Sequence, residues 1–270
     1  MDKQSQIIQE LGVQPTIDAP AEIRKRVDFL KDYLKANPFA KGLLIAISGG
    51  VDSAVAAGLC KLATDELSRE SGQDYITLGV FQPFGEQEDI EDSYAVAEAF
   101  QLTHKVETDI EDAVDELCLE AEYGLKSIGI HKHLSVGGKG NVKARTRMVL
   151  QYALAFELNL LVVGTDHASE AITGFFTKYG DGAVDITPLS TLTKRQVRLL
   201  AKELGVPEAI LNKAPSAGLW PGQTDEKELG ITYEDNSDYL EGKKISEEIS
   251  RKLESRYELT RHKREPIPRI

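Results

Sequence analysis

Three short, almost purely aliphatic runs recur along the chain, and segments with helical periodicity lie between them. The runs are LLIAIS (43–48), ITLGVF (76–81) and LLVVG (160–164), with a weaker candidate at 103–110. The helical segments are expected near 21–35, 52–70, 89–101, 111–123 and 141–158. Aliphatic runs this short and continuous are typical of strands buried on both faces. The alternation therefore predicts an α/β fold, a parallel sheet flanked by helices, with helical additions at both ends.

Parallel sheets of this kind bind ligands at the carboxyl ends of their strands. Three Gly- and polar-rich stretches are candidate binding loops for that edge: SVGGKGN (135–141), TKYGDGA (177–183) and SAGLWPGQTDEKELG (216–230).

The charge and composition of the chain argue against some classes of protein function. The 270 residues carry a net charge of −12, which disfavours a nucleic-acid partner because such proteins usually present a basic surface. No run approaches the roughly 18 apolar residues of a membrane span, and the polar start MDKQSQIIQE lacks a signal-peptide core. We therefore expect a soluble, cytoplasmic protein with no membrane partner, whose two cysteines, Cys60 and Cys118, are reduced and buried.

The first aliphatic run ends in a glycine turn, Ser48-Gly49-Gly50, and a helical stripe resumes at Val51. Glycine lets the backbone approach a ligand closely, and the first amides of a helix have no partner inside the helix. Those amides and the helix dipole favour an anion, most naturally a phosphate group. From these residues alone, a plain tight turn capped by Asp52 is an equally good interpretation.

Asp52 distinguishes this turn from the common phosphate loops. The Walker pattern G-x-x-x-x-G-K-[ST] and the pattern G-x-G-x-x-G are both absent. Where the Walker loop has a lysine, this turn has a carboxylate, which repels phosphate unless a cation bridges the two. The sequence therefore indicates Mg²⁺, which proteins usually hold through one or two carboxylates and phosphate oxygens.

The stretch SGGVDS (48–53) resembles the pyrophosphate loop of the N-type ATP pyrophosphatases, which cleave ATP between the α and β phosphates. Four further stretches are similar to ammonia-dependent NAD synthetase: GNVKARTRM (140–148), GTDHASEAITGFFTKYGDG (164–182), LTKRQVRLLAKELGVP (192–207) and HKR (262–264). The similarity extends from the N-terminal helix almost to the end of the chain. It implies a Rossmann-like adenine nucleotide alpha-hydrolase fold, in a single synthetase domain over 1–270 without a glutaminase domain.

The resemblance also implies a reaction and its partners. Deamido-NAD, ATP and ammonia would give NAD, AMP and pyrophosphate through an adenylated intermediate, with Mg²⁺ as the metal. Relatives of this kind are homodimers, so a homodimer is expected. Two alternatives stay open: another ATP pyrophosphatase, tRNA-modifying or GMP-forming, or a non-catalytic ATP-binding sensor. The chain lacks zinc-type cysteine pairs, which argues against a tRNA enzyme, and a sensor would not need the acids and lysines that match the family.

The family's functional residues carry over to matching positions of this sequence in three sets. The expected catalytic residues are Asp52, Glu170 and Lys194, of which Asp52 and Glu170 would bind the metal. The expected ATP-binding residues are Ala46, Ile47, Ser48, Gly49, Gly50, Val51, Asp52, Ser53, Thr165, Lys194 and Ser216. The expected deamido-NAD-binding residues are Arg145, Lys178, Asp185, His262 and Lys263.

Without the family, several of these residues have simpler interpretations. Arg145 is in line with an apolar stripe on helix 141–158, made of Val142, Val149, Tyr152 and Phe156. An arginine there more often extends its charge to solvent than binds a ligand. Arg147, two residues on, is expected to point elsewhere, toward solvent.

The acidic and basic loop residues allow a second interpretation as well. Glu170 fits a first-turn acid that the helix dipole stabilises, and the lysines and the His262–Lys263 pair fit ordinary surface charges. His167 is assigned no role, because a lone histidine in a polar loop is weak evidence for a base.

Two stretches depart from the family pattern. Many relatives end the second strand with VRLPYG, whose arginine lies near the adenine, whereas this chain has VFQPFG (80–85). Phe81 or Phe84 is then a candidate to stack on the base. The C-terminal HKREPIPRI also lacks the aromatic-acidic tail that is common in relatives.

Overall fold

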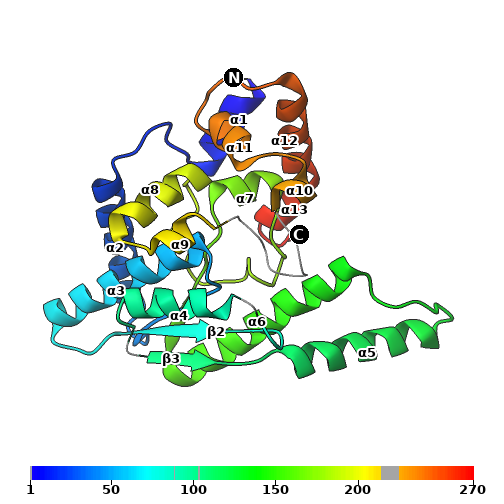
Figure 1. Cartoon of the computed structure of the whole chain (residues 1–270), viewed down its shortest axis with the longest axis horizontal. Helices are drawn as coiled ribbons and strands as arrows, with labels where there is room; N and C mark the ends of the chain where they lie inside the picture. Colours follow the sequence, from blue (N-terminus) through cyan, green and yellow to red (C-terminus); the bar gives the residue numbers. More distant parts are fainter. Residues whose placement is uncertain (1, 88, 103, 214–224) are drawn as a thin grey trace.

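A four-stranded parallel sheet forms the centre of the protein, seen in a computed structural model that describes residues 2–87, 89–102, 104–213 and 225–270 (Figure 1). The strands are β1 (Gly42–Ala46), β2 (Ile76–Phe81), β3 (His104–Glu107) and β4 (Leu160–Val163). Their order across the sheet is β3-β2-β1-β4, and every pair is parallel. The four predicted strands are thus confirmed, including the weak candidate at 103–110, which forms the edge strand β3.

The strand order fixes where a ligand can bind. From β1 the chain moves outward in one direction through β2 and β3, and then returns to place β4 on the other side of β1. In open parallel sheets, ligands bind outside the carboxyl ends of the strands where this reversal occurs. Here that point lies between β1 and β4.

Helices make up most of the rest of the described chain. They are α1 (Lys3–Leu11), α2 (Ala19–Ala36), α3 (Val51–Ser71), α4 (Ile90–Ala99), α5 (Glu111–Ser127), α6 (Val136–Leu158), α7 (Ala168–Thr173), α8 (Lys194–Leu204), α9 (Glu208–Leu211), α10 (Asp225–Leu229), α11 (Tyr233–Leu240), α12 (Glu247–Leu259) and α13 (Arg261–Arg264).

Both faces of the three aliphatic strands β1, β2 and β4 are largely buried, as their continuous aliphatic runs predict, whereas the edge strand β3 is largely exposed. Side chains of a strand alternate between the two faces. In β1, Leu43 and Ile45 pack with α2, α3 and α8, whereas Leu44 packs with β2, β4 and α6 on the opposite face. All three residues are fully buried. The strand runs therefore lack polar positions because neither face meets water.

A second hydrophobic cluster lies apart from the sheet and joins the two ends of the chain. Ile7 of α1 packs there with Ile172 of α7, Tyr239 of α11, and Leu253 and Tyr257 of α12. In Figure 1 these helices gather at the top of the view, beyond α8. The expected helical additions at both ends are confirmed, and they form one unit.

Helix α6 begins at Val136, earlier than the expected start at 141, and two predictions about this region are wrong in part. Ser135 accepts a hydrogen bond from Gly138 N–H as the N-cap, so the stretch SVGGKGN belongs to the helix and not to a binding loop. Glycine and serine suggested a loop, but a good cap and the packing of the helix outweigh their low helix propensity. The predicted stripe is also only half buried, because Val149 is 58% and Phe156 82% exposed.

The cysteines lie inside the fold, as expected. Cys60 and Cys118 are free and buried, and burial raises the pKa of both thiols above the ordinary value. In the described part of the chain, no helix is both long enough and apolar enough to cross a membrane.

The central strand gives a direct test of this packing. Replacement of Ile45 by alanine should lower the free energy of unfolding by about 2–5 kcal/mol, because the cavity left in a fully buried site cannot close. Ile267→Ala removes the same atoms from a side chain that is 65% exposed, and it should change stability by less than about 0.5 kcal/mol. Urea unfolding followed by circular dichroism measures both. Equal losses for the two variants would contradict the packing described here.

Candidate active site

The glycine turn after β1 packs tightly against the start of α4. Gly49 has a φ of +74°, in the left-handed region that favours glycine, and a Cβ added there would lie 2.9 Å from Asp92 Cβ. Gly50 is the N-cap of α3, and because glycine has no side chain, no side-chain hydrogen bond caps the start of this helix. The first amides of α3 are therefore left for a ligand, as an anion-binding turn requires.

Internal hydrogen bonds hold the turn in shape. Ser53 Oγ donates to Gly50 O at 3.0 Å and accepts from Ser48 N–H at 3.2 Å. Ile47 is a core residue, 3% exposed, whose N–H donates to Val80 O, so only its backbone faces the turn. The stretch 46–53 thus runs from the last residue of β1 through a preformed turn into the first turn of α3.

An ion pair joins this turn to a distant part of the sequence. Lys194, the first residue of α8, is 2% exposed, and its Nζ lies 2.5 Å from Asp52 Oδ2. Burial alone would raise the pKa of Asp52, but the Lys194 ammonium and His167 lower that pKa below the ordinary range of aspartate. Asp52 is therefore ionised at neutral pH.

The segment that follows β4 completes the cluster. His167 is fully buried, with its Nε2 3.4 Å from Asp52 Oδ1 and 3.7 Å from Glu170 Oε2. Neither ring nitrogen of His167 has a hydrogen-bond partner among the described residues, and the same holds for Asp52 Oδ1. Buried polar atoms without partners are rare in folded proteins, and they point to a bound group at this place.

A divalent cation fits these residues. Asp52, His167 and Glu170 each offer an atom, and the three atoms lie within 4.8 Å of one another. Asp52 Oδ2 is occupied by Lys194, whereas Oδ1 is unpartnered and faces the other two side chains. The two carboxylates are the oxygen donors that Mg²⁺ prefers. The structure therefore brings together the two residues expected to bind the metal.

The ionisation of Glu170 supports the same conclusion. Burial, together with repulsion from Asp52 and Asp166, raises the pKa of Glu170 to about 8, against the opposing effect of His167. Burial, with repulsion from Asp181 and Asp52, also raises the pKa of Asp166 well above its usual range. Burial and the repulsion between these carboxyl groups therefore favour the protonated forms of Glu170 and Asp166, whereas Asp52 stays ionised beside Lys194. A bound cation would favour the ionised form of Glu170.

Four of the five residues expected to bind deamido-NAD form a second group. Arg145 donates to Lys178 O at 3.1 Å, and Lys178 Nζ donates to His262 O at 2.6 Å. Lys263 Nζ donates to the carbonyls of Gly174 and Phe176, both at 2.7 Å. These contacts tie α6 and α13 to the loop after α7, so the four residues come together at this loop.

The other expected residues have different surroundings. Asp185 accepts hydrogen bonds from Tyr152 Oη at 3.1 Å and from Val162 N–H at 2.7 Å, so both of its oxygens already have partners. Thr165 is half-buried just beyond the carboxyl end of β4. Ser216 lies outside the described residues.

Sequence reasoning missed or misplaced three residues. His167 lies close to both Asp52 and Glu170, although the sequence assigned it no role. Its position directly before a predicted polar helix start, beside Glu170, was the pattern that could have indicated a role. Arg147 is not turned to solvent, because its Nε donates to Gln82 O at 3.0 Å at the end of β2. Phe81 is buried with its ring edge-to-face on Tyr94, which leaves no open face for a base.

The sequence comparisons match this chain to NAD synthetases over nearly its whole length. The family model described as NAD synthase matches residues 22–267. The chain is 49% identical over 264 residues to the NH(3)-dependent NAD(+) synthetase of Rhodococcus opacus, covering 96% of this chain and 94% of that protein.

Solved structures agree with the sequence comparison. An NAD+ synthetase from Burkholderia pseudomallei superimposes with a TM-score of 0.82 at 37% identity, over 97% of this chain and 96% of that one. An NMN synthetase from Francisella tularensis has the same TM-score at 35% identity. The match covers 94% of this chain and 99% of that one. The glycine turn, the buried Asp52–Lys194 pair and these matches over nearly the whole length lead to one conclusion: the chain belongs to the NAD synthase family.

Proposed function

We propose that this protein amidates deamido-NAD with ammonia, at the expense of ATP, to give NAD, AMP and pyrophosphate. Its curated relatives at 48–49% identity carry that activity in their names. The observation in the structure that carries the proposal is the group formed by Asp52, His167, Glu170 and Lys194. It lies at the carboxyl ends of β1 and β4, where the fold binds ligands.

The chemistry needs two displacements. A carboxylate resists ammonia because its leaving group would be oxide. In the first step an oxygen of the nicotinate carboxylate forms a bond to the α-phosphorus of ATP, and the bond to pyrophosphate breaks. In the second, the nitrogen of ammonia forms a bond to the acyl carbon, the bond to AMP breaks, and the nitrogen loses a proton to solvent or base.

The residues of the chain act mainly by position and charge. The amides of the glycine turn and the buried ammonium of Lys194 face the site where negative charge develops on the leaving pyrophosphate. Asp52 and Glu170 would hold Mg²⁺, which when bound offsets the charge of the phosphates. Arg145, Lys178, His262 and Lys263 surround the loop that we assign to deamido-NAD.

Ammonia itself is the proposed nitrogen donor. Release of ammonia from glutamine commonly uses a nucleophilic thiolate, and a reactive cysteine is accessible with a lowered pKa. Both cysteines here are buried with raised pKa values. We therefore propose that the chain is a single synthetase domain that takes free ammonia.

We also propose a homodimer formed through α5 and α6. These helices leave apolar side chains in water, and the largest exposed fraction there is that of Phe156, at 82%. The others are Leu117, Leu119, Tyr123, Val136, Val149 and Leu158. The two helices pack against each other, and large apolar side chains left exposed on neighbouring elements are typical of a protein interface.

Product analysis tests the activity. The purified protein with ATP, Mg²⁺, ammonium and deamido-NAD should give NAD and one AMP per NAD, whereas glutamine in place of ammonium should give little. A parallel reaction with nicotinate mononucleotide addresses the resemblance to an NMN synthetase. Faster turnover of the mononucleotide would assign the protein to that activity, and no amidation of either acid would refute the proposal.

The metal site is tested by Asp52→Asn. The change removes the charge that holds the cation and the partner of Lys194, so kcat/KM should fall by at least about a hundredfold. Binding of Mn²⁺, followed by electron paramagnetic resonance, should weaken in parallel. Asp65→Asn removes the same charge from a half-exposed side chain of α3 that pairs with Lys61, and it should leave both quantities unchanged. A normal Mn²⁺ affinity in Asp52→Asn would rule out the metal role.

The proposed interface is tested at α6. Phe156→Ser combined with Val149→Ser should convert a dimer to a monomer in analytical ultracentrifugation, because both side chains lie outside the core of one subunit. Thermal unfolding at high protein concentration checks that the fold is retained. A wild-type protein that is monomeric at micromolar concentration, or a variant that stays dimeric, would contradict the proposal.

A further inference from the structure

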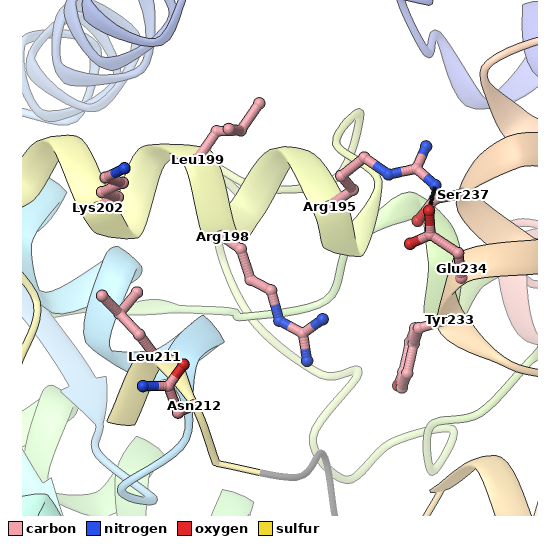
Figure 2. A pocket seen from close by; sticks show the side chains of 9 residues that line it. All are labelled: Arg195, Arg198, Leu199, Lys202, Leu211, Asn212, Tyr233, Glu234 and Ser237. Carbon is pink, nitrogen blue, oxygen red and sulfur yellow. Dashed lines mark hydrogen bonds and ion pairs between the residues drawn. The ribbon is translucent and has the colours of Figure 1, made fainter. Parts of the chain in front are cut away.

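A pocket near Asp52, His167 and Glu170 contains the side chain of Arg198, which has no partner among the residues that the structure describes. The pocket has a volume of about 330 Å³ and lies between α8, the end of α9 and the start of α11. Its lining is Arg195, Arg198, Leu199, Lys202, Leu211, Asn212, Tyr233, Glu234 and Ser237. Figure 2 shows Arg198 extending from α8 toward the space between these helices, whereas Arg195 turns toward Glu234.

The two arginines differ in their partners. Arg195 forms ion pairs with Glu234, Asp238 and Glu241, so its charge is matched inside the protein. Arg198 has no ion pair or hydrogen bond to any described side chain, and its Nε is buried without a partner. The buried Nε has lost its contact with water without gaining a protein partner, and an anion bound in the pocket would supply that partner.

The position of Arg198 relates the pocket to the reaction site. Arg198 follows Lys194 by four residues on α8, and residues at this spacing are neighbours on the same side of a helix. Tyr233 lines the pocket, and its ring centroid is 5.1 Å from Lys194 Nζ and 6.2 Å from the ring of His167. An anion bound by Arg198 would therefore lie within one helical turn of the Lys194–Asp52 pair.

The proposed function identifies the chemical class of that anion. In the proposed reaction, the ligand next to Lys194 is the triphosphate of ATP, which carries several negative charges. The reaction then releases part of this triphosphate as pyrophosphate. A guanidinium binds phosphate oxygens through two parallel hydrogen bonds, which a lysine cannot do. Asn212 adds an amide and Lys202 a second positive charge at the rim.

We propose that this pocket is a subsite for the terminal phosphates of ATP and for the pyrophosphate product, with Arg198 as the residue that contacts them. The inference rests on the proposed function, which supplies the polyphosphate. It extends the phosphate site from the glycine turn and Lys194 along α8.

Direct binding of pyrophosphate tests the subsite without turnover. Isothermal titration calorimetry with pyrophosphate and Mg²⁺ should show a dissociation constant about 10- to 100-fold weaker for Arg198→Gln than for the wild type. The KM for ATP should rise to a similar extent, whereas AMP, which lacks the terminal phosphates, should bind both proteins equally. Arg198→Lys should be intermediate because it keeps the charge and loses the paired hydrogen bonds.

Matched variants separate this role from a structural one. Arg251→Gln removes the same charge from a side chain on α12 that is 79% exposed, and it should change none of these values. Arg198→Met keeps most of the volume and should behave as Arg198→Gln, with an unchanged urea midpoint. Unchanged pyrophosphate binding in folded Arg198 variants would overturn the proposal. Weaker pyrophosphate binding with an unchanged KM for ATP would also overturn it, because the pocket would then bind a free anion and not the nucleotide.

The same experiments distinguish a failure of the subsite from a failure of the proposed function. If the wild type makes NAD and Arg198→Gln binds ATP and pyrophosphate normally, only the subsite is wrong. If the wild type amidates neither acid, the proposed function is wrong, and loss of pyrophosphate binding in Arg198→Gln still reports on the pocket.

Discussion

The arrangement of the site depends on one ion pair, between Lys194 and Asp52. Lys194 is almost fully buried, and an ammonium in that position is stable only beside a negative charge. The pair fixes the start of α8 against the start of α3 and leaves Oδ1 of Asp52 directed at His167 and Glu170. A phosphate site and a metal site can then lie next to each other. One carboxylate oxygen of Asp52 pairs with Lys194, and the other has no partner among the described residues and can bind a cation.

The fold supplies the setting for this pair. The order β3-β2-β1-β4 places the turn after β1 next to the segment after β4, so the N-termini of α3 and α7 come together at one edge of the sheet. The N-terminus of α8 joins them through Lys194. The positive ends of three helix dipoles meet at this edge of the sheet, and such a place favours bound anions.

Local sequence patterns were sufficient for the architecture and for the turn. Continuous aliphatic runs predict strands because burial on both faces excludes polar residues. The two glycines of SGGVDS predict a tight turn between a strand and a helix, and the structure has that turn, with Gly49 in the left-handed region beside α4. Contacts between distant segments were not predictable in the same way. His167 and Asp52 are far apart in sequence, and only the position of β4 beside β1 brings them together. Arg147 looked solvated because its partner, the carbonyl of Gln82, lies on another element. Every residue has a backbone carbonyl, so the sequence does not show which one accepts a hydrogen bond.

The proposed function requires Asp52 and Glu170 to hold a cation against the phosphates of ATP at the glycine turn. A crystal structure with Mn²⁺ and a non-hydrolysable ATP analogue tests it most directly, because the anomalous signal of manganese locates the ion independently of any model. The account predicts a peak bonded to oxygens of Asp52, Glu170 and the nucleotide phosphates, with the phosphates on the amides of the turn at 48–53. Phosphates in another cleft, or a manganese peak away from both carboxylates, would contradict it.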